Sequence, residues 1–388
     1  MTAGEAARFQ PDYAASPAEY LNLVLSRLGM TQSDLAARTG LSAKHINQIV
    51  KGIANVSPET ASQLEFATGE PAELWAALDA RHQALKARTK ARERLAASLS
   101  WLDKFNLKEL HKRGLIPGHT HSVETAEALL RYFGISDPDG WDRVWKPSLT
   151  SFRRSPSFTP DATATTVWLR SGQRAASHIK TAPYDPKALQ AAVPELRSLT
   201  TLDPSAALPE LQTRMAGLGV AVVYVAEFDG CRASGATWWA SPDKAVILLS
   251  NRGKREDRFW FSFFHEVGHV LLHAKRDTFL DQSHSAGSEE DSPPWADPAP
   301  TSALIDDGSR DSKVELEADS FAQGSLIPTD ALPLIPQLSS EAAVIELAGR
   351  IGVSAGVVAG RYQYETNDYR KYNRLRRQVP HQLFEVPV

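Results

Sequence analysis

The chain has 388 residues, enough for two or three domains, and 42% hydrophobic and 23% charged residues are typical of a globular protein, not a disordered or fibrous one. No run approaches the roughly 18 consecutive apolar residues of a membrane span, and the N-terminus lacks an apolar secretory signal, so we expect a cytoplasmic protein with no membrane partner. The lone cysteine, Cys231, excludes an intrachain disulfide, and the net charge of −3 gives no whole-chain argument for nucleic-acid binding.

Short helices with clear boundary residues are predicted over the first 90 residues. Ser16 followed by Pro17 is typical of a helix start, and Gly29 and Gly40 are typical of helix ends. The same signals recur along this stretch and predict short helices over residues 17–28, 32–39, 43–51, 58–68 and 71–89. Residues 1–90 therefore form an expected all-α domain.

The second and third of these helices have the pattern of a helix-turn-helix. Leu35 on one helix and Ile46 and Ile49 on the other can pack together at a steep angle while one polar face stays free. Side-chain amides on that face can pair with adenine in the major groove, and lysines can reach guanine or phosphate. The candidate DNA-binding residues are Gln32, Ser42, Lys44, His45, Asn47, Gln48 and Lys51. A solvated helix pair in an unrelated bundle is the alternative.

Residues 17–82, from PAEYLNLVLSRLG through INQIVKG to PETASQLEFATGEPAELW and ARH, resemble the HigA-type antitoxin branch of the xenobiotic-response-element (XRE) family of bacterial repressors. The resemblance implies a homodimer that binds palindromic operator DNA. Residues 1–90 carry nine basic and nine acidic side chains, so we expect modest non-specific affinity for DNA.

The next segment, residues 91–204, is predicted to be a mainly helical connecting region without a motif. A run of charge overlaps its start, since ten basic and three acidic residues lie between positions 81 and 113. A solvated helix face and a surface facing phosphates explain this run equally well.

A small sheet beside a buried helix is predicted after residue 205. Residues 219–228 and 244–250 are Val- and Ile-rich runs of strand length, and residues 235–241 between them alternate less cleanly. Residues 256–275 then form a strongly apolar helix. The C-terminal domain, 205–388, is therefore expected to be α+β.

That apolar helix contains His265-Glu266-Val267-Gly268-His269, an H-E-x-x-H motif. Residues i and i+4 share a helix face, so both imidazoles can meet one Zn²⁺ while Glu266 acts on a bound water as the catalytic base. A chance match in a chain of this composition has an expectation of roughly 0.02. His273 lies one turn further, and we expect it at the surface, with a role as a further ligand as the alternative.

A third metal ligand is expected on the helix predicted over residues 314–328. Glu315 and Asp319 are four residues apart, so Glu315 can bind the metal while Asp319 hydrogen-bonds the far nitrogen of a ligating histidine. Glu317 is expected to point elsewhere. The alternative is that these acids only solvate the helix. The Ser-, Pro- and Asp-rich insert before them, about 276–313, is predicted to be a mobile loop that limits access to the metal.

Residues 205–330, which include ILLS, RFWFSFFHEVGHVLLH and ELEADSFAQGSLIP, resemble the ImmA/IrrE family of metallopeptidases. The resemblance implies a zincin-like fold, zinc coordination by His265, His269 and Glu315, and Glu266 as general base. The insert departs from the family pattern by lengthening the interval between His269 and Glu315, and a lid, an autoinhibitory segment and a tether are all open.

Together these motifs predict a multidomain DNA-binding regulator fused to a zinc endopeptidase, with operator DNA and a repressor or toxin-related protein as partners. The main alternative is an antitoxin or autorepressor whose metal domain is a sensor or scaffold that cleaves nothing. A metal enzyme acting on small molecules has no cofactor or phosphate loop in its favour. The candidates for an oxyanion stabiliser are His273, His284 and Tyr362, without a spacing argument for any of them.

Overall fold

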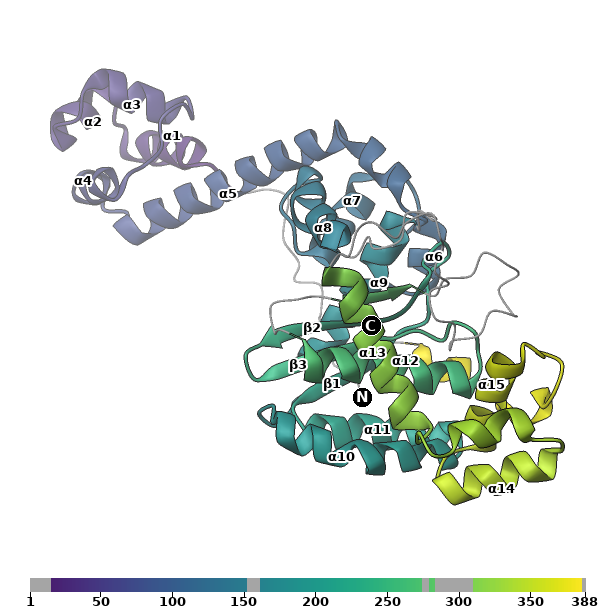
Figure 1. Cartoon of the computed structure of the whole chain (residues 1–388). Helices are drawn as coiled ribbons and strands as arrows, with labels where there is room; N and C mark the ends of the chain where they lie inside the picture. The colour runs from purple at the N-terminus through teal and green to yellow at the C-terminus, as the bar shows by residue number, and fades with distance from the viewer. Residues whose placement is uncertain (1–14, 152–160, 274–278, 283–309, 386–388) are drawn as a thin grey trace. The chain divides into compact units, whose positions relative to one another are not determined.

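The chain forms two compact units, Met1–Leu99 and Ser100–Val388 (Figure 1). The computed structural model describes residues 15–151, 161–273, 279–282 and 310–385. The boundary expected at residue 90 falls inside helix α5 (Ala72–Ala96), which has no Gly or Pro that could end it there. The boundary expected at residue 204 falls inside the second unit, so the connecting region and the small sheet belong to one compact body.

Five helices make up the described part of the first unit: α1 (Pro17–Leu28), α2 (Gln32–Thr39), α3 (Ala43–Val50), α4 (Pro58–Thr68) and α5. Their ends follow from the residues that flank them. Ser16 and Thr31 each form a capping box with an acid three residues later, and Gly29 and Gly40 end α1 and α2 in the left-handed conformation. The all-α prediction for this part of the chain is confirmed.

The core of the first unit lies where α2 and α3 meet the other helices. Leu35, Ile46 and Ile49 are at most 1% exposed, and they cluster with the fully buried Trp75 of α5. Tyr20 of α1 meets the edge of that indole with ring centroids 5.1 Å apart. Burial of one side of α3 leaves its other side to the solvent, as the helix-turn-helix pattern predicts.

The second unit places helices around a four-stranded sheet of order β1-β3-β2-β4. Strand β1 is parallel to β3, and both other pairs are antiparallel. The strands are β1 (Val220–Tyr224), β2 (Ala233–Ser241), β3 (Lys244–Leu249) and β4 (Phe279–Gln282). The α-helices before the sheet are α6 (Leu107–Lys112), α7 (Val123–Phe133), α8 (Asp139–Ser151), α9 (Ala162–His178), α10 (Pro186–Ser198) and α11 (Pro204–Gly217), and those that follow β3 are α12 (Glu256–Leu272), α13 (Arg310–Leu326), α14 (Glu341–Ile351) and α15 (Ala355–Thr366). Short 3₁₀ turns η1 (Leu99–Lys104), η2 (Leu199–Thr201), η3 (Leu332–Gln337), η4 (Asn373–Leu375) and η5 (His381–Phe384) complete the described elements.

Strand β4 corrects one expectation, because it lies inside the insert that was predicted to be a loop throughout. Its residues pair with β2, with Phe279 opposite Thr237. Backbone hydrogen bonding to a neighbouring strand stabilises this segment even though it has no apolar period of its own. Residues 276–278 and 283–309 of the predicted mobile insert lie outside the described residues.

Helices cover both faces of the sheet, because side chains alternate along each strand. Ile247 and Leu249 of β3 join the core formed with α11 and α12. Leu248 points the other way, toward α9, where a Cβ added at Gly172 would lie 2.5 Å from it. Helices α9 and α12 therefore lie on opposite faces of the sheet.

Two buried carboxylates, each in an ion pair with an arginine, hold the start of α12 in place. Asp257 is 0% exposed and meets Arg376 with an Nη2–Oδ2 distance of 2.9 Å, and the neighbouring Glu256 meets the guanidinium of Arg377. Helix α15 presents Gly360 to Asp257, and a Cβ there would lie 2.4 Å from Oδ2. The segment that follows α15 thus ties itself to the N-terminus of α12, where negative charge is favoured by the helix dipole.

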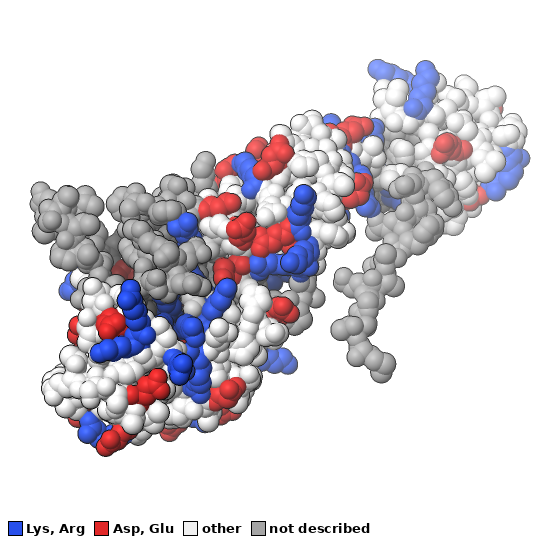
Figure 2. All heavy atoms as spheres, turned by 90° about the vertical axis from the view of Figure 1, so that its right-hand side faces the viewer, with Lys and Arg blue, Asp and Glu red and all other residues white. Residues whose placement is uncertain are grey.

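Acidic and basic side chains lie interspersed on the face shown in Figure 2, with a group of Lys and Arg side chains low in the view.

Within the described residues, no single helix is long and apolar enough to cross a membrane, and only the pair α14 and α15, bent by 115°, reaches that length and composition together.

We expect Arg376→Leu to lower the free energy of unfolding by about 3–5 kcal/mol, because it leaves the buried carboxylate of Asp257 without its cation. Urea unfolding followed by fluorescence measures the change. Adding Asp257→Asn should restore much of the loss, and Arg374→Gln, at an exposed position of the same segment, should change stability by less than about 0.5 kcal/mol. A wild-type midpoint in Arg376→Leu would show that the ion pair does not anchor this segment.

Candidate metal centre and DNA-reading helix

The two histidines of the H-E-x-x-H motif point at one spot on the buried side of α12. His265 and His269 are 3% and 1% exposed, and their Nε2 atoms lie 2.9 Å apart. Four residues of α-helix place them one above the other, and the apolar residues that precede them bury the helix against the sheet. The motif's predicted geometry is therefore present.

Glu315 of α13 completes a cluster of three candidate ligands. Its Oε2 lies 3.3 Å from Nε2 of His265 and 3.5 Å from Nε2 of His269. Tetrahedral bonds of about 2.0–2.1 Å separate two donor atoms by roughly 3.3 Å. Two imidazoles and one carboxylate at this spacing can therefore hold a metal ion and leave a fourth position open.

Both histidines have a partner for the ring nitrogen that faces away from the cluster. Nδ1 of His265 lies 2.8 Å from Oδ1 of Asp319, as the spacing on α13 predicts. Nδ1 of His269 lies 3.0 Å from Nδ1 of His273, whose Nε2 lies 3.3 Å from Oε2 of Glu317. With Nδ1–H donated outward, both Nε2 lone pairs face the candidate metal position.

The position of His273 corrects one expectation, because its side chain is only 5% exposed and not at the surface. Glu317 contacts His273 and is not part of the three-ligand cluster. The sequence spacing alone did not reveal this contact, because α12 ends at Leu272 and the extended backbone at His273 directs its side chain back along the helix.

Charge in the cluster suits a cation. Burial lowers the pKa of His269 to about 4, so its imidazole is neutral at neutral pH. Burial alone would raise the pKa of Glu315, but hydrogen bonds with His265 and His269 outweigh it and hold that pKa well below its ordinary value. A neutral imidazole and an ionised carboxylate are the forms that bind metals.

Gly268, between the two histidines, sets how closely α13 can approach. A Cβ at this position would lie 3.2 Å from the Cα of Ala318 and 3.3 Å from the side chain of Phe321. The helices can meet at this distance because the glycine has no side chain. This close helix contact brings Glu315 within reach of the histidines of α12.

Glu266, the predicted base, lies against strand β2. It is 0% exposed, and its Oε2 accepts a hydrogen bond of 2.5 Å from Oγ1 of Thr237. Gly235 leaves room for the carboxylate, since a Cβ there would lie 2.3 Å from Oε1. Sequence analysis missed Thr237 and Gly235, although their alternate positions on one strand place both on the same sheet face.

Two of the three candidates for an oxyanion stabiliser make other side-chain contacts. His273 lies between His269 and Glu317, and the hydroxyl of Tyr362 accepts a hydrogen bond of 3.2 Å from Nζ of Lys371. His284 lies outside the described residues.

The candidate DNA-binding residues gather on α3 and beside it. One stripe of α3, opposite the buried Ile46 and Ile49, has the spacing i, i+3, i+4, i+7 and consists of Lys44, Asn47, Gln48 and Lys51. Both lysines are exposed. His45 lies beside this stripe and is half-buried. Ser42 caps the helix, since its Oγ accepts a hydrogen bond from the backbone of His45.

Gln32 and Asn47 are brought together from two helices. Nδ2 of Asn47 donates a hydrogen bond of 3.1 Å to Oε1 of Gln32, the first residue of α2. Both side chains are half-buried, and the contact fixes the two amides relative to one another.

Comparison with known families agrees with the two kinds of domain. Residues 23–75 match the family described as helix-turn-helix, and residues 221–292 match the peptidase family described as IrrE N-terminal-like domain. No curated protein matches the chain. The second match contains the H-E-x-x-H motif but ends before Glu315, so the third candidate ligand rests on the geometry.

The fold and the two sites define a multidomain protein with a DNA-binding part and a metallopeptidase-type part. This chain joins an XRE-type helix-turn-helix domain to an ImmA/IrrE-like peptidase-family domain, which confirms the suspected fusion.

Gly268→Ala should weaken metal binding by at least about tenfold, because the added methyl group pushes α13 and its Glu315 away from the histidines. Competition with a chromogenic chelator measures the affinity. Gly324→Ala is the matched control on α13, where a Cβ would meet nothing within 4 Å. Equal affinities in the two variants would show that the close helix contact does not position Glu315.

Proposed function

We propose that the chain is a DNA-binding transcriptional regulator fused to a zinc-dependent endopeptidase that cleaves a repressor or another partner protein. The observation that carries the proposal is the convergence of Nε2 of His265, Nε2 of His269 and Oε2 of Glu315 beside the carboxylate of Glu266. The match to a peptidase family and the helix-turn-helix match support the two halves.

Zinc fits this donor set better than the harder cations. Mg²⁺ and Ca²⁺ favour oxygen ligands, whereas two imidazoles with one carboxylate and an open position are typical of catalytic zinc. Cys231 cannot replace one of these three ligands, since it is buried and burial raises the pKa of its thiol to about 11.

The residues around the metal have distinct roles in this proposal. His265, His269 and Glu315 hold the zinc, which would acidify a water molecule and polarise the scissile carbonyl. Glu266 accepts the proton of the attacking water and passes it to the leaving amine. Thr237 fixes the carboxylate of Glu266 by its 2.5 Å hydrogen bond, and Asp319 fixes the ring of His265.

The sheet beside Glu266 suits an extended peptide. Strand β4 ends the strand order and pairs with β2, which carries Thr237. A peptide can add to such an edge through backbone hydrogen bonds, without a requirement for one particular sequence. The peptidase-family match supports a protein substrate over a small molecule.

A second function is favoured by one observation, the complete burial of Glu266. A carboxylate that is 0% exposed and held by Thr237 can also be part of a closed structural site. The chain would then be an antitoxin-like autorepressor whose metal domain is a sensor or scaffold. The two functions require the same metal ligands and differ in the role of Glu266.

The proposed DNA site consists of Gln32, Ser42, Lys44, His45, Asn47, Gln48 and Lys51, and we place the protein in the cytoplasm, where operator DNA is accessible. The proposal includes a homodimer on a palindromic operator. Phe66 of α4 is 88% exposed, and an aromatic side chain of that exposure is a candidate contact between two copies.

Asn47→Ala with Gln48→Ala should abolish the preference of the full chain for its operator, at about 1–3 kcal/mol per lost base contact. Selection from a random DNA pool by the wild-type chain gives the operator, and fluorescence anisotropy measures each affinity. Arg38→Gln, an exposed substitution on α2 away from the stripe, is the control for charge. Selection of the same operator by the double variant would show that another surface reads the bases.

Glu266→Gln should retain zinc and operator binding but lose peptide cleavage by about 10²–10⁴-fold, since the amide cannot accept the proton. Mass spectrometry of a proteome-derived peptide library, incubated with the zinc-loaded chain, measures cleavage. Glu346→Gln, exposed on α14, is the matched control.

Cleavage by wild type and by Glu346→Gln, but not by Glu266→Gln, supports the endopeptidase. Equal cleavage by all three excludes Glu266 as the base. Full zinc loading without cleavage by wild type would favour the sensor or scaffold function.

A further inference from the structure

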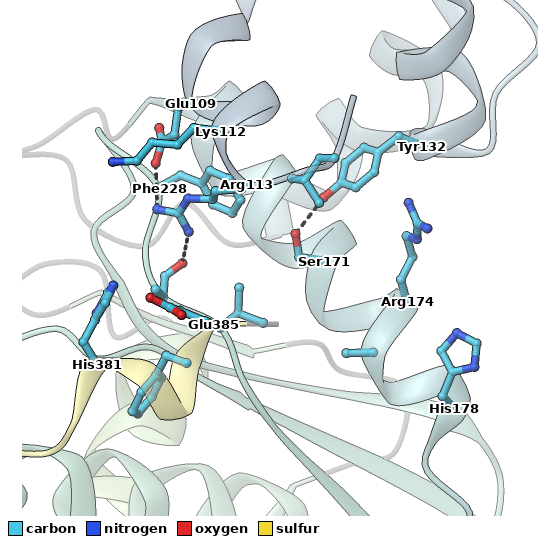
Figure 3. Close-up of a pocket in the computed structure, with 15 residues that line it drawn as sticks. Glu109, Lys112, Arg113, Tyr132, Ser171, Arg174, His178, Phe228, His381 and Glu385 are labelled. Carbon is cyan, nitrogen blue, oxygen red and sulfur yellow. Dashed lines mark hydrogen bonds and ion pairs between the residues drawn. The ribbon is translucent and has the colours of Figure 1, made fainter. Parts of the chain in front are cut away.

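A cavity of about 510 Å³ lies in the second unit, between helices α6, α7 and α9 and the end of strand β1 (Figure 3). The short turn η5 and Glu385 also line it. Sites for small organic ligands have volumes of roughly 300–1,000 Å³. The cavity is therefore large enough for a small molecule.

The inner surface of the cavity is apolar. Val225 and Ala226 follow β1, and Phe228 and Phe384 add two aromatic rings. Each of these four residues is at most 3% exposed, so packing holds them in place and only a small part of each faces the cavity. This apolar floor favours a ligand with an aliphatic or aromatic body.

The rim of the cavity carries an excess of groups that are or can become cationic. These are Lys112 of α6 and Arg113 directly after it, Arg174 and His178 of α9, and His381 of η5, and the acids among the lining residues are Glu109 and Glu385. Glu109 is engaged by Arg113, with an Oε1–Nη2 distance of 2.7 Å. In the part of the chain that the structure describes, no hydrogen bond or ion pair joins Lys112, Arg174, His178 or His381 to a carboxylate.

Arg113 is committed to the architecture, whereas Arg174 is available to a ligand. Nη1 of Arg113 donates to the carbonyl oxygen of Ala226 at 2.9 Å, and its guanidinium lies 3.9 Å from the ring centre of Phe228. Arg174 is exposed, and its guanidinium lies over the face of Tyr132, 5.4 Å from the ring centre. Figure 3 shows Arg174 and His178 side by side on α9 at one end of the cavity.

The polar groups inside the cavity do not neutralise this charge. The hydroxyl of Tyr132 lies 2.7 Å from Oγ of Ser171 and donates to the carbonyl oxygen of Val167 at 2.8 Å. Burial raises the pKa of Tyr132 to about 12, so the phenol is neutral at physiological pH. Lys112 and Arg174 outnumber Glu385, the lining acid that Arg113 does not engage, so an anionic ligand would meet a net positive field.

The cavity is separate from the metal cluster. Arg174 belongs to α9, and α9 and the metal-ligand helix α12 cover opposite faces of the sheet. The two sites are connected by one aromatic contact, since Phe384 of the cavity floor lies 6.1 Å from Phe259 of α12, measured between ring centres. A ligand on this floor would touch a side chain that packs directly on the metal-ligand helix.

We propose that this cavity binds a small organic anion, with an apolar or aromatic body on Phe228 and Phe384 and one carboxylate or phosphate group at Arg174 and His178. The two parts of this ligand match the two parts of the cavity lining. The floor contributes van der Waals contacts to the apolar body, and the guanidinium contributes charge-assisted hydrogen bonds. The cavity offers these interactions whether or not the peptidase-type domain cleaves peptides.

The test is calorimetric titration of the full metal-loaded chain with phenylacetate, octanoate and phenyl phosphate, each beside a neutral partner: phenylacetamide, octanamide and benzyl alcohol. We expect at least one anion to bind and its neutral partner to bind at least about tenfold more weakly. Comparison of the carboxylates with phenyl phosphate identifies the preferred anionic group.

Two variants and one control locate the binding. Arg174→Gln should lower the affinity for the anion by about tenfold or more. Ala175→Phe, which fills the cavity, should abolish binding. Lys180→Gln, an exposed substitution outside the lining, should leave the affinity unchanged. The metal content should be equal in all four proteins, because the metal cluster is not altered.

Absence of binding by all three anions up to millimolar concentration would overturn the proposal. So would an affinity that is the same in wild type, Arg174→Gln and Ala175→Phe, because the anion would then be bound elsewhere. Equal affinity for an anion and its neutral partner would remove the proposed role of Arg174 and His178.

Discussion

The contact between α12 and α13 at Gly268 is the constraint on which the candidate metal centre depends. A helix can place His265 and His269 on one face without help, but two imidazoles do not make a three-ligand site. The third donor, Glu315, comes from a helix far along the chain, and it reaches the histidines because a residue without a side chain lets the helix backbones approach. A local sequence motif thus becomes a site through one long-range contact.

The rest of the second unit holds α12 in place from several directions. Its first turn is tied to the C-terminal segment by Asp257 and Arg376, and its middle packs on Ile247 and Leu249 of the sheet. Strand β2 then holds the carboxylate of Glu266 through Thr237. Buried charges of this kind are expensive unless each has its partner, so the ends and the middle of the helix are fixed together.

The two units present different kinds of surface for different ligands. In the first unit, buried Ile46 and Ile49 orient α3 so that its polar stripe faces outward, which is what the reading of base edges requires. In the second unit the groups converge inward, onto the metal cluster and, on the other sheet face, onto the cavity at Arg174. The proposed function uses both kinds of surface in one chain.

The sequence by itself determined the elements whose signals are local. Ser16, Thr31 and Gly29 set helix ends in the first unit, and the four-residue spacing of His265 and His269 set their common face, because hydrogen bonds and helix periodicity act over a few residues. The spacing on α13 likewise predicted the contact of Asp319 with His265.

Only the tertiary structure decided what depends on distant segments meeting. Thr237 beside Glu266, Glu317 beside His273, the pairing of β4 with β2, and the cavity beneath Arg174 each join residues that lie tens of positions apart. Such contacts follow from side-chain packing across the whole second unit, and no short pattern encodes them.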